Sequence, residues 1–383
     1  MAMIFGTYQN KKTSMANKSK ILHVASFTGN IGDNASHFGF REILSALNKD
    51  VIIDQIEIRR SYSNYSGRNK FQFDESFAAL TDNYDLVIFG GGAFLDYWIP
   101  SSSNGTTIDI PTNVLDMMST SILITSIGAY PHKKVPAGNH GKFMRFLEYI
   151  VDSEKINIAF RNDGSLLHLK STFKSVDFSG FPEILDNAFF WDLQPEYNSL
   201  YELPFVAINI TNDQMGMGNV LVDEAKYYRE LRELVSKIID RGRKVVFVPH
   251  IHEDLISITK FFNGKFDYKL RENIFVAPCV QNNIGAESSF NIYKFAEFVV
   301  ASRFHANVCS MNFGCNVIGL SPLPRVKYLH ESLGTPDTYL NLAPGFSDRI
   351  LTKIDEEKVC KKNISERIRQ KKAESLLVYA KYV

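Results

Sequence analysis

The chain lacks a strong charge of either sign and lacks any long apolar run. Lys and Arg number 43 against 42 Asp and Glu, which leaves a formal net charge of +1. This balance argues against a protein that binds nucleic acid through a broad basic face. No segment approaches the roughly 20 consecutive apolar residues of a transmembrane helix, and residues 1–20 lack the apolar centre of a signal peptide. The expected location is therefore the cytoplasm.

Cysteine and tryptophan are also scarce. The four cysteines, Cys279, Cys309, Cys315 and Cys360, form no C-x-x-C pair, so neither a zinc knuckle nor a redox dithiol is expected. The chain has only 2 Trp but 29 Phe and 17 Tyr, enough rings for a large core and for stacking on sugars. Hydrophobic residues make up 45% and charged residues 22%, which is the composition of an ordinary globular protein.

The length of 383 residues suggests two domains. In the first part of the chain, apolar runs typical of buried parallel strands alternate with stretches of helical periodicity. The predicted strands are 21–27, 51–58, 85–92, 121–128 and 156–161, and the predicted helices include 138–151 and one that follows the turn 29–33, capped by Asp33 or Asn34. This alternation predicts βαβ units in a parallel sheet.

A proline-containing linker at 192–204 precedes a second alternating series. Its predicted strands are 204–210, 243–250, 273–278, 297–304 and 316–321, with a polar loop at 211–219 and helices at 221–240 and 305–313. The expected organisation is a flexible leader (1–20), a first α/β domain (21–197), a second α/β domain (198–353) and a helical segment (354–383) that packs back on the first domain. Ligands of such sheets bind outside the carboxyl ends of the strands, here in a cleft between the domains.

Two glycine-containing loops follow predicted strands. GNIGD (29–33) and the three glycines of FGGGAFLD (89–96) leave room for a ligand to approach the backbone at a helix N-terminus. Neither loop is a dinucleotide or Walker motif. A tight strand-to-helix turn explains GNIGD equally well, but it explains the three glycines less well, because each glycine costs backbone entropy. Asp96 is suited to bonding a sugar hydroxyl, or to sitting as an acid at a helix N-terminus.

The sharpest local signal is SRFH (302–305), at the end of a predicted buried strand and the start of a helix. Arg303 suits a carboxylate or phosphate, and His305 can give a proton near neutral pH. Arg161 ends a strand of the first domain in the same way, so one arginine from each domain can clamp a small anion. A solvated strand end with a capping histidine is the plainer alternative. VPHIHED (248–254) contains His250 and His252, for which hydrogen bonding or a structural role is favoured over metal binding.

Together these segments resemble the polysaccharide pyruvyl transferase family over roughly residues 21–335. The motifs that carry the resemblance are GNIGD (29–33), VIFGGGAFLD (87–96), SIGAYP (126–131), FRNDGS (160–165), DNAFF (186–190), VPHIHED (248–254) and ASRFHANVCSMNFGCNVIGLS (301–321). The resemblance implies two Rossmann-like domains facing across a cleft, as in GT-B glycosyltransferases. It also implies transfer of a pyruvyl group from phosphoenolpyruvate onto two hydroxyls of one sugar of a surface polysaccharide or its precursor, forming a cyclic ketal and releasing phosphate.

With this resemblance the candidate site residues fall into three groups. The catalytic candidates are His305 as general acid, with Asp33 and Asp254. The donor-binding candidates are Arg161, Arg303, Ser302, His250 and Asn209. The acceptor-side candidates are Asn30, Asn34, Gly91, Gly92, Asp96 and Tyr130. No cofactor or metal is expected, because phosphoenolpyruvate itself is the donor substrate.

Two other functions fit the same scaffold. A glycosyltransferase with a nucleotide-sugar donor needs an acid for the ribose, for which Glu287 and Glu297 are the candidates. A non-catalytic protein of a polysaccharide pathway would bind saccharide and release no phosphate. If the acceptor is lipid-linked, the lysines at 11, 12, 18 and 20 can assist a peripheral membrane contact, although a solvated tail explains them as well.

Overall fold

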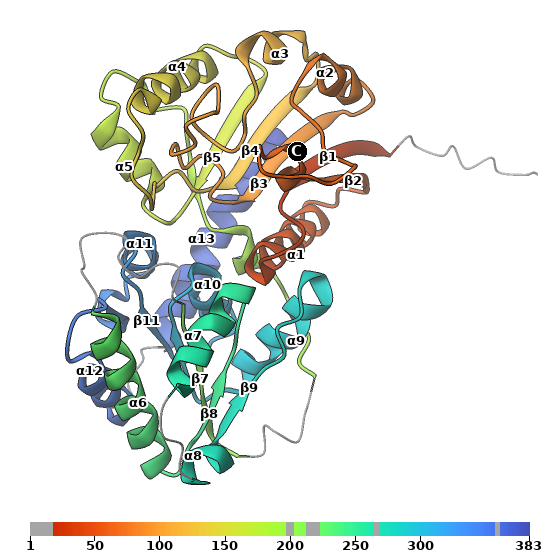
Figure 1. Ribbon diagram of the computed structural model, residues 1–383. Coiled ribbons are helices and arrows are strands. Elements are labelled where there is room, and N and C mark those ends of the chain that lie inside the picture. The colour runs from red at the N-terminus through yellow and green to blue at the C-terminus, as the bar shows by residue number, and fades with distance from the viewer. Residues whose placement is uncertain (1–17, 197–202, 212–222, 264–267, 357–360) are drawn as a thin grey trace, which may run out of the picture.

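The computed structural model describes residues 18–196, 203–211, 223–263, 268–356 and 361–383. The described chain forms two halves, each built on a six-stranded parallel sheet and joined end to end (Figure 1). The predicted boundary at 197/198 and the middle of the predicted linker (192–204) fall on residues 197–202, outside the described residues. Among the described residues, no helix is long and apolar enough to cross a membrane.

The first sheet has the strand order β2-β1-β3-β4-β5-β6. Its strands are β1 (Ser19–Ala25), β2 (Val51–Glu57), β3 (Leu86–Gly92), β4 (Ser121–Ile127), β5 (Ile156–Arg161) and β6 (Glu183–Ile184). Every residue of β3 is buried, as its unbroken apolar run predicts for a central parallel strand. The expected leader is wrong for Ser19 and Lys20, which pair with Val51 and Ile52 of β2. The two-residue strand β6 is too short to give a sequence pattern.

Helices on both faces cover this sheet. They are α1 (Ile31–Ala46), η1 (Ile58–Ser61), α2 (Glu75–Thr81), α3 (Thr112–Met117), α4 (Asn139–Val151), α5 (Ser165–Thr172) and η2 (Asn187–Phe190). We expected Asp33 or Asn34 to cap α1. The cap is instead Asn30, whose side chain accepts a hydrogen bond from the N–H of Gly32. Helix α1 therefore begins earlier than predicted, and Asp33 lies in its first turn, where an acid is favourable.

The second sheet has the strand order β12-β11-β10-β7-β8-β9, the 3-2-1-4-5-6 order of doubly wound dinucleotide-binding sheets. Its strands are β7 (Phe205–Asn209), β8 (Lys244–Phe247), β9 (Ile274–Val276), β10 (Phe298–Ala301), β11 (Val317–Leu320) and β12 (Tyr339–Leu340). These strands are shorter than predicted, because the last residues of each predicted run, such as His250 and Ser302, already belong to the loops at the carboxyl edge. Most of the predicted loop 211–219 lies outside the described residues.

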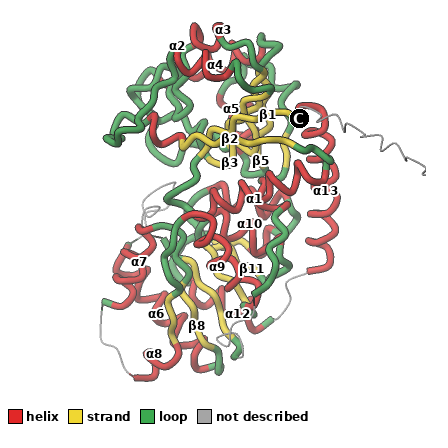
Figure 2. The backbone as a smooth tube through the Cα atoms, turned by 90° about the vertical axis from the view of Figure 1, so that its right-hand side faces the viewer, coloured by secondary structure: helices red, strands yellow, loops and turns green. Residues whose placement is uncertain are grey.

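The helices of the second half are α6 (Glu224–Asp240), α7 (His252–Phe262), α8 (Tyr268–Asn273), α9 (Asn282–Phe295), α10 (Phe304–Asn312), α11 (Pro324–Ser332), η4 (Pro336–Thr338), α12 (Phe346–Asp355) and α13 (Lys361–Tyr382). Helix α13 runs alongside both halves (Figures 1 and 2). Ile364 and Ile368 near its start join the core of the second half. Tyr379 near its end packs under the first sheet and accepts a hydrogen bond from Thr125.

The junction between the halves is a continuous core rather than a loose contact. Helix α1 lies against α9 and α10 of the other half (Figure 2), and its Ile31 and Ala35 share one apolar cluster with Phe290 and Val308. Polar contacts cross the junction too, because the side-chain amide of Asn34 donates to Asn283 Oδ1 at 3.0 Å. Burying α1 between the halves brings the carboxyl edges of both sheets to a common cavity.

Candidate functional site

A cavity of about 1100 Å³ opens between the carboxyl edges of the two sheets. The second half contributes a small charged and aromatic group of lining residues: His250, Arg303, Phe304, His305, Leu323, Arg325 and Val326. The first half contributes most of the lining, mainly polar and aromatic loop residues at 61–64, 70, 72–74, 92–94, 98–101, 103, 106, 107, 109 and 111, together with Asn30, Asp33, His132 and Arg161. The cavity thus has a compact polar end and a long wall.

Arg161 is the last residue of β5 and is only 2% exposed. Its Nε donates to Asp163 Oδ2 at 2.6 Å, its Nη1 lies 3.5 Å from Asp186 Oδ2, and its Cζ lies 4.2 Å from the ring centre of Phe304. Burial opposes the charge of this guanidinium, but Asp163 and Asp186 outweigh burial and hold the pKa of Arg161 above its ordinary value. Arg161 is therefore a fixed cation, held partly by the other half of the molecule.

Arg303 directly precedes α10 and is held within its own half. Its Nε and Nη2 both bond Asp254, at 2.9 and 2.6 Å, and Nη2 also donates to Thr211 Oγ1 at 2.9 Å. Its backbone N–H donates to Asn209 Oδ1 at 2.9 Å. Asp254 and Asn209 were expected to act on substrate directly, yet neither is among the described residues that line the cavity. Both orient Arg303 from behind.

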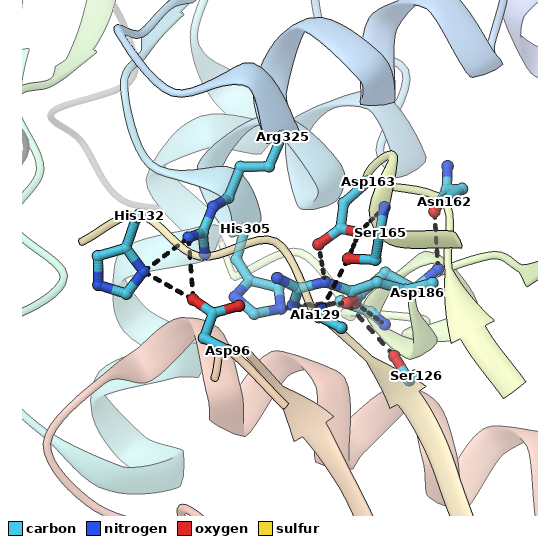
Figure 3. Close-up of polar contacts among 12 residues, drawn as sticks. Asp96, Ser126, Ala129, His132, Asn162, Asp163, Ser165, Asp186, His305 and Arg325 are labelled. Atoms are coloured by element: carbon cyan, nitrogen blue, oxygen red, sulfur yellow. Dashed lines mark hydrogen bonds and ion pairs between the residues drawn. The ribbon is translucent and has the colours of Figure 1, made fainter. Parts of the chain in front are cut away.

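His305 lies in the first turn of α10, beside Asp186 of the first half (Figure 3). Its Nε2 lies 3.4 Å from Asp186 Oδ2 and makes no hydrogen bond with any residue that the structure describes. Burial raises the pKa of Asp186, but His305 and Arg161 together outweigh burial and hold it below the ordinary value. Asp186 is therefore ionised and faces both His305, the expected acid, and Arg161, the expected donor-binding arginine. It is the first residue of DNAFF (186–190), a motif to whose residues the sequence analysis assigned no role.

The backbone is shaped to bring these groups together. A Cβ on Gly32 of α1 would lie 2.5 Å from His305 Nδ1, so only glycine lets the imidazole pack on this turn. Ser126 has a φ of +50° at an irregularity in the pairing of β4, a conformation that non-glycine residues rarely adopt. Its hydroxyl lies 3.3 Å from Asp186 Oδ2 and accepts the N–H of Asn187. Strain of this kind is found where surrounding structure imposes it, often at functional sites.

His250 and Asp33 also line the cavity, with different electrostatics. Burial lowers the pKa of His250 well below its ordinary value, so this imidazole is neutral, and its Nε2 lies 2.8 Å from the hydroxyl of Tyr293. Burial raises the pKa of Asp33, although Arg59, 3.6 Å away, opposes the rise. A carboxyl with a raised pKa beside a cavity is suited to accept or give a proton.

The structure brings seven of the predicted residues to the cavity wall: Asn30, Asp33, Gly92, Arg161, His250, Arg303 and His305. Among the described residues, the lining does not include Asn34, Gly91, Tyr130, Asp96, Ser302, Asn209 or Asp254. Asn34 bonds Phe27 O and Asn283. Gly91 has a φ of +81° and packs on Ser36 and His37, so two of the acceptor-side candidates serve the packing of α1.

Tyr130 packs with His168 and Tyr328, and the backbone N–H of Ser302 donates to the carbonyl oxygen of Asn209. Asp96 lies behind His132 and Arg325, which do line the cavity (Figure 3). His132 and Arg325 are the residues that sequence reasoning missed. His132 directly follows SIGAYP (126–131). Arg325 lies four residues after the end of ASRFHANVCSMNFGCNVIGLS (301–321), so both residues are close to motifs of the family resemblance.

Comparison with known proteins identifies the family. A sequence model described as polysaccharide pyruvyl transferase matches residues 30–324, which contain all the residues just described as holding Arg161, Arg303 and His305. The chain belongs to this family. No curated protein shows significant similarity to the sequence of this transferase.

Solved structures show the fold of the transferase. It is similar to a glycosyltransferase from Rickettsia africae (14% identity, covering 96% of this chain and 97% of that one, TM-score 0.55). It is also similar to Staphylococcus aureus MnaA solved with UDP (12% identity, 91% and 90% covered, TM-score 0.52) and to the UDP-GlcNAc 2-epimerase of Methanocaldococcus jannaschii (10% identity, 94% and 99% covered, TM-score 0.52). The expected α/β fold with two Rossmann-like domains, as in GT-B enzymes, is confirmed.

The two arginines present N–H donors to the transferase's cavity, and the carboxyl of Asp33 is also among the lining groups. The carboxylates that pair with the two arginines, Asp163, Asp186 and Asp254, are not among the described lining residues, whereas the guanidinium groups are. N–H groups fixed in this way suit a planar anion and require little reorganisation when it binds. Within the described ranges, no group of three or more His, Cys, Asp or Glu side chains is placed to hold a metal ion.

Proposed function

We propose that this transferase moves the pyruvyl group of phosphoenolpyruvate onto two hydroxyls of one sugar in a surface polysaccharide or its precursor. The observation that carries the proposal is the placement of Arg161 and Arg303, one from each half, on the same cavity as His305. Family membership supports a sugar-modifying transferase. The fixed cations support a small donor with two acidic groups.

The donor carries a carboxylate and a phosphate, and each is matched by a guanidinium group. Arg161 and Arg303 are both oriented by carboxylates before any ligand binds, so the donor gains their hydrogen bonds without ordering two long side chains. His305 then stands next to the bound enol, with the carboxylate of Asp186 on its other side, 3.4 Å from Nε2. No cofactor or metal enters this scheme.

The proposed chemistry begins when His305 gives a proton to C3 of the donor. C2 becomes electrophilic, and an oxygen of the first sugar hydroxyl bonds to it. The bond between C2 and the phosphate oxygen then breaks, and the phosphate leaves with the bonding electrons, stabilised by the arginines. The second hydroxyl bonds to C2 and closes the ketal. The two hydroxyls release two protons in total, of which one replaces the proton given to C3 and one leaves with phosphate.

The acceptor occupies the wall contributed by the first half. Tyr62 and Trp98 offer rings for stacking, and Ser63, Asn64 and other polar residues offer hydrogen bonds. The cavity volume of about 1100 Å³ is large for a three-carbon donor, so the acceptor is an oligosaccharide, free or lipid-linked. Asp33, with its raised pKa, is placed on the cavity to take a hydroxyl proton. Membrane contact through the N-terminal lysines stays a prediction: Lys11 and Lys12 lie outside the described residues, and Lys18 pairs with Asp50.

The first test is phosphate release from phosphoenolpyruvate in the presence of oligosaccharide acceptors, with mass spectrometry of the product. We expect a mass gain of one pyruvyl ketal per acceptor. His305→Ala should bind the donor but lose about 10²–10⁴-fold in kcat, the usual contribution of a general acid. His140→Ala, an exposed histidine of α4 outside the cavity lining, is the matched control. Parental turnover by His305→Ala would exclude His305 as the acid.

The donor clamp is tested with Arg303→Lys, which keeps a cation opposite Asp254. Loss of the forked hydrogen bonds should weaken donor binding by about 10–100-fold, since charged hydrogen bonds contribute about 1.5–3 kcal/mol. An unchanged donor affinity would contradict the clamp. Transfer of a sugar from a nucleotide-sugar, with no phosphate released from phosphoenolpyruvate, would instead indicate a glycosyltransferase. Saccharide binding without any transfer would indicate a non-catalytic protein. For the nucleotide alternative, neither Glu287 nor Glu297 is among the described lining residues, and Glu297 is already paired with Arg243.

A further inference from the structure

The cavity contains a second histidine next to a carboxylate, in addition to His305 and Asp186. His132 follows β4 and Asp96 follows β3, so both come from the carboxyl edge of the first sheet. His132 Nδ1 lies 2.7 Å from Asp96 Oδ2 (Figure 3). Asp96 is only 2% exposed, whereas the side chain of His132 is 24% exposed and lines the cavity. The carboxylate is thus buried behind an accessible imidazole.

This geometry determines which ring nitrogen carries the proton. A carboxylate at 2.7 Å accepts a hydrogen bond, so we assign the proton of the neutral ring to Nδ1, which donates to Asp96. The lone pair is then on Nε2. An imidazole held in this tautomer by a carboxylate is the arrangement of a general base.

The charges around the pair come from both halves. Arg325 of α11 reaches across the cavity, and its Nη2 lies 3.6 Å from Asp96 Oδ2 and 3.0 Å from His132 Nδ1. Nδ1 cannot donate to Asp96 and accept from Arg325 at once, and the shorter contact is to the carboxylate. Arg161 and His168 are also within electrostatic reach of Asp96, and Lys133 lies over the ring of Trp98, beside His132. Asp96 therefore has two cationic neighbours besides the imidazole.

The pair also adjoins the expected sugar-binding wall. The rings of His132 and Trp98 meet edge to face, with centres 5.7 Å apart, and both side chains line the cavity. Indole rings are suited to packing against sugars, because they offer a flat apolar face and one N–H donor. A sugar seated next to Trp98 has its hydroxyls within reach of His132 Nε2.

We propose that His132 is a catalytic base that takes the proton from an acceptor hydroxyl as that oxygen bonds to C2 of the donor, and that Asp96 is its positioning residue. The inference rests on the proposed function. Forming a cyclic ketal removes protons from two hydroxyls, and one of these protons, taken first by Asp33, is returned to His305, with which Asp33 interacts electrostatically. The other is accepted by His132 and passes to solvent or to the departing phosphate, which completes the proton balance. The two histidines thus act on the donor and the acceptor, respectively.

The decisive variant is His132→Asn. The amide N–H of asparagine takes the place of Nδ1–H toward Asp96, so the hydrogen bond to the carboxylate remains while Nε2 is lost. We expect kcat to fall by about 10²–10⁴-fold, with the dissociation constant of phosphoenolpyruvate within twofold of the parent. His140→Asn, a substitution at the exposed histidine of α4, is the matched control and should leave turnover unchanged.

Two further readouts separate a base from a structural residue. Imidazole added to His132→Ala should restore turnover in proportion to its unprotonated fraction, and no such rescue is expected for Asp96→Ala. Asp96→Asn should lower kcat, leave the acceptor KM within about threefold, and shift the acid limb of the profile of kcat/KM against pH, because an amide no longer holds the ring in one tautomer. Thermal unfolding of each variant checks that the fold is retained.

The outcomes distinguish this inference from the proposed function. If the parent protein forms the ketal and His132→Asn turns over at the parental rate, His132 is not the base, while the proposed function stands. A raised acceptor KM with unchanged kcat, or absence of imidazole rescue in a folded His132→Ala, would also overturn the inference. If the parent releases no phosphate from phosphoenolpyruvate with any acceptor, the proposed function itself fails.

Discussion

The two halves hold their arginines in different ways. Among the described residues, Asp254 and Thr211 of its own half hold the guanidinium group of Arg303. Arg161 is fixed by Asp163 of its own half but also stacks against Phe304, and it shares Asp186 with His305. Phe304 and His305 both belong to the second half. One arginine is therefore preorganised within a single sheet, and the other depends on how the halves meet.

This difference follows from where each half places its polar residues. In the second half, Asn209, Asp254 and Arg303 come from three neighbouring carboxyl ends and bond one another. In the first half, the carboxyl ends open toward a long wall, and the second half contributes Phe304 and His305 to complete the surroundings of Arg161. We conclude that donor binding through Arg303 is local, whereas alignment of Arg161 with His305 requires the junction to be intact.

The largest effects are expected when either guanidinium is removed. Arg303→Ala strands the buried Asp254, and Arg161→Ala strands Asp163 and Asp186, each at a cost of about 3–5 kcal/mol in the free energy of unfolding. The two variants differ in extent, because loss of Arg161 should speed amide hydrogen exchange in both halves and loss of Arg303 only in the second. Urea unfolding and hydrogen exchange measure both quantities.

The control for this pair is Arg145→Ala, since Arg145 is an exposed arginine of α4 and surface substitutions usually change stability by less than about 0.5 kcal/mol. If Arg161→Ala lowers the free energy of unfolding by less than about 1 kcal/mol, Asp163 and Asp186 do not depend on Arg161 for their stabilisation. Exchange confined to the first half in that variant would contradict its dependence on the junction.

A smaller effect, on catalysis rather than stability, is expected from Gly32→Ala. The added Cβ would lie 2.5–2.8 Å from His305 Nδ1, Cβ and Cγ, so the imidazole must move away from Asp186. A displacement near 1 Å lowers turnover by about 10²-fold, while donor binding through Arg303 should persist. Steady-state kinetics with phosphoenolpyruvate as the varied substrate separates the two. Gly180→Ala, where a Cβ meets nothing within 4 Å, is the matched control.

The fold was largely readable from the sequence because both sheets are parallel and buried. The strands Leu86–Gly92 and Phe205–Asn209 consist almost entirely of apolar residues, and such a run would be unfavourable at a solvent-exposed surface. The sequence therefore predicts that they are buried strands. Arg161, Arg303 and His305 were found for a related reason: a charged residue directly after such a run lies at a carboxyl edge, where parallel sheets bind ligands.

The rest of the site depends on contacts that no local pattern records. Asp186 meets His305 across 119 positions of sequence only because α1 and η2 pack on α10. Arg325 reaches Asp96 from the opposite half. Asp254 and Asn209 were singled out correctly as polar residues at strand ends, but their hydrogen bonds to Arg303 show that they orient it, which spacing along the chain does not reveal.

The contact of Arg161 with Phe304 provides a weaker test of the junction. The guanidinium lies 4.2 Å from the ring centre, and a buried cation–π contact contributes about 1–2 kcal/mol. Phe304→Leu should therefore destabilise by about this amount beyond its loss of apolar area, and the effect should disappear in an Arg161→Met background. A double-mutant cycle from urea unfolding measures the coupling. The same cycle with Arg303→Met should give no coupling, and equal coupling to both arginines would remove the proposed difference.

The last expected effect is a dependence on pH, and it again compares the halves. Burial lowers the pKa of His37, in the first half, to about 4, and that of His330, in the second, to about 3. Below pH ~6.5, the ordinary histidine pKa, these two rings bind protons in the unfolded chain but stay neutral in the folded one. The free energy of unfolding therefore decreases as pH falls below ~6.5, by about 1 kcal/mol per pH unit for each ring. His37→Gln should flatten the dependence of the unfolding free energy on pH only down to pH ~4. His330→Gln, whose ring bonds Thr338 and Asn307 away from the cavity, should flatten it further, to pH ~3. Urea midpoints between pH 7 and 5 check the common slope, and profiles parallel to the parent would show that neither imidazole is held neutral by its half.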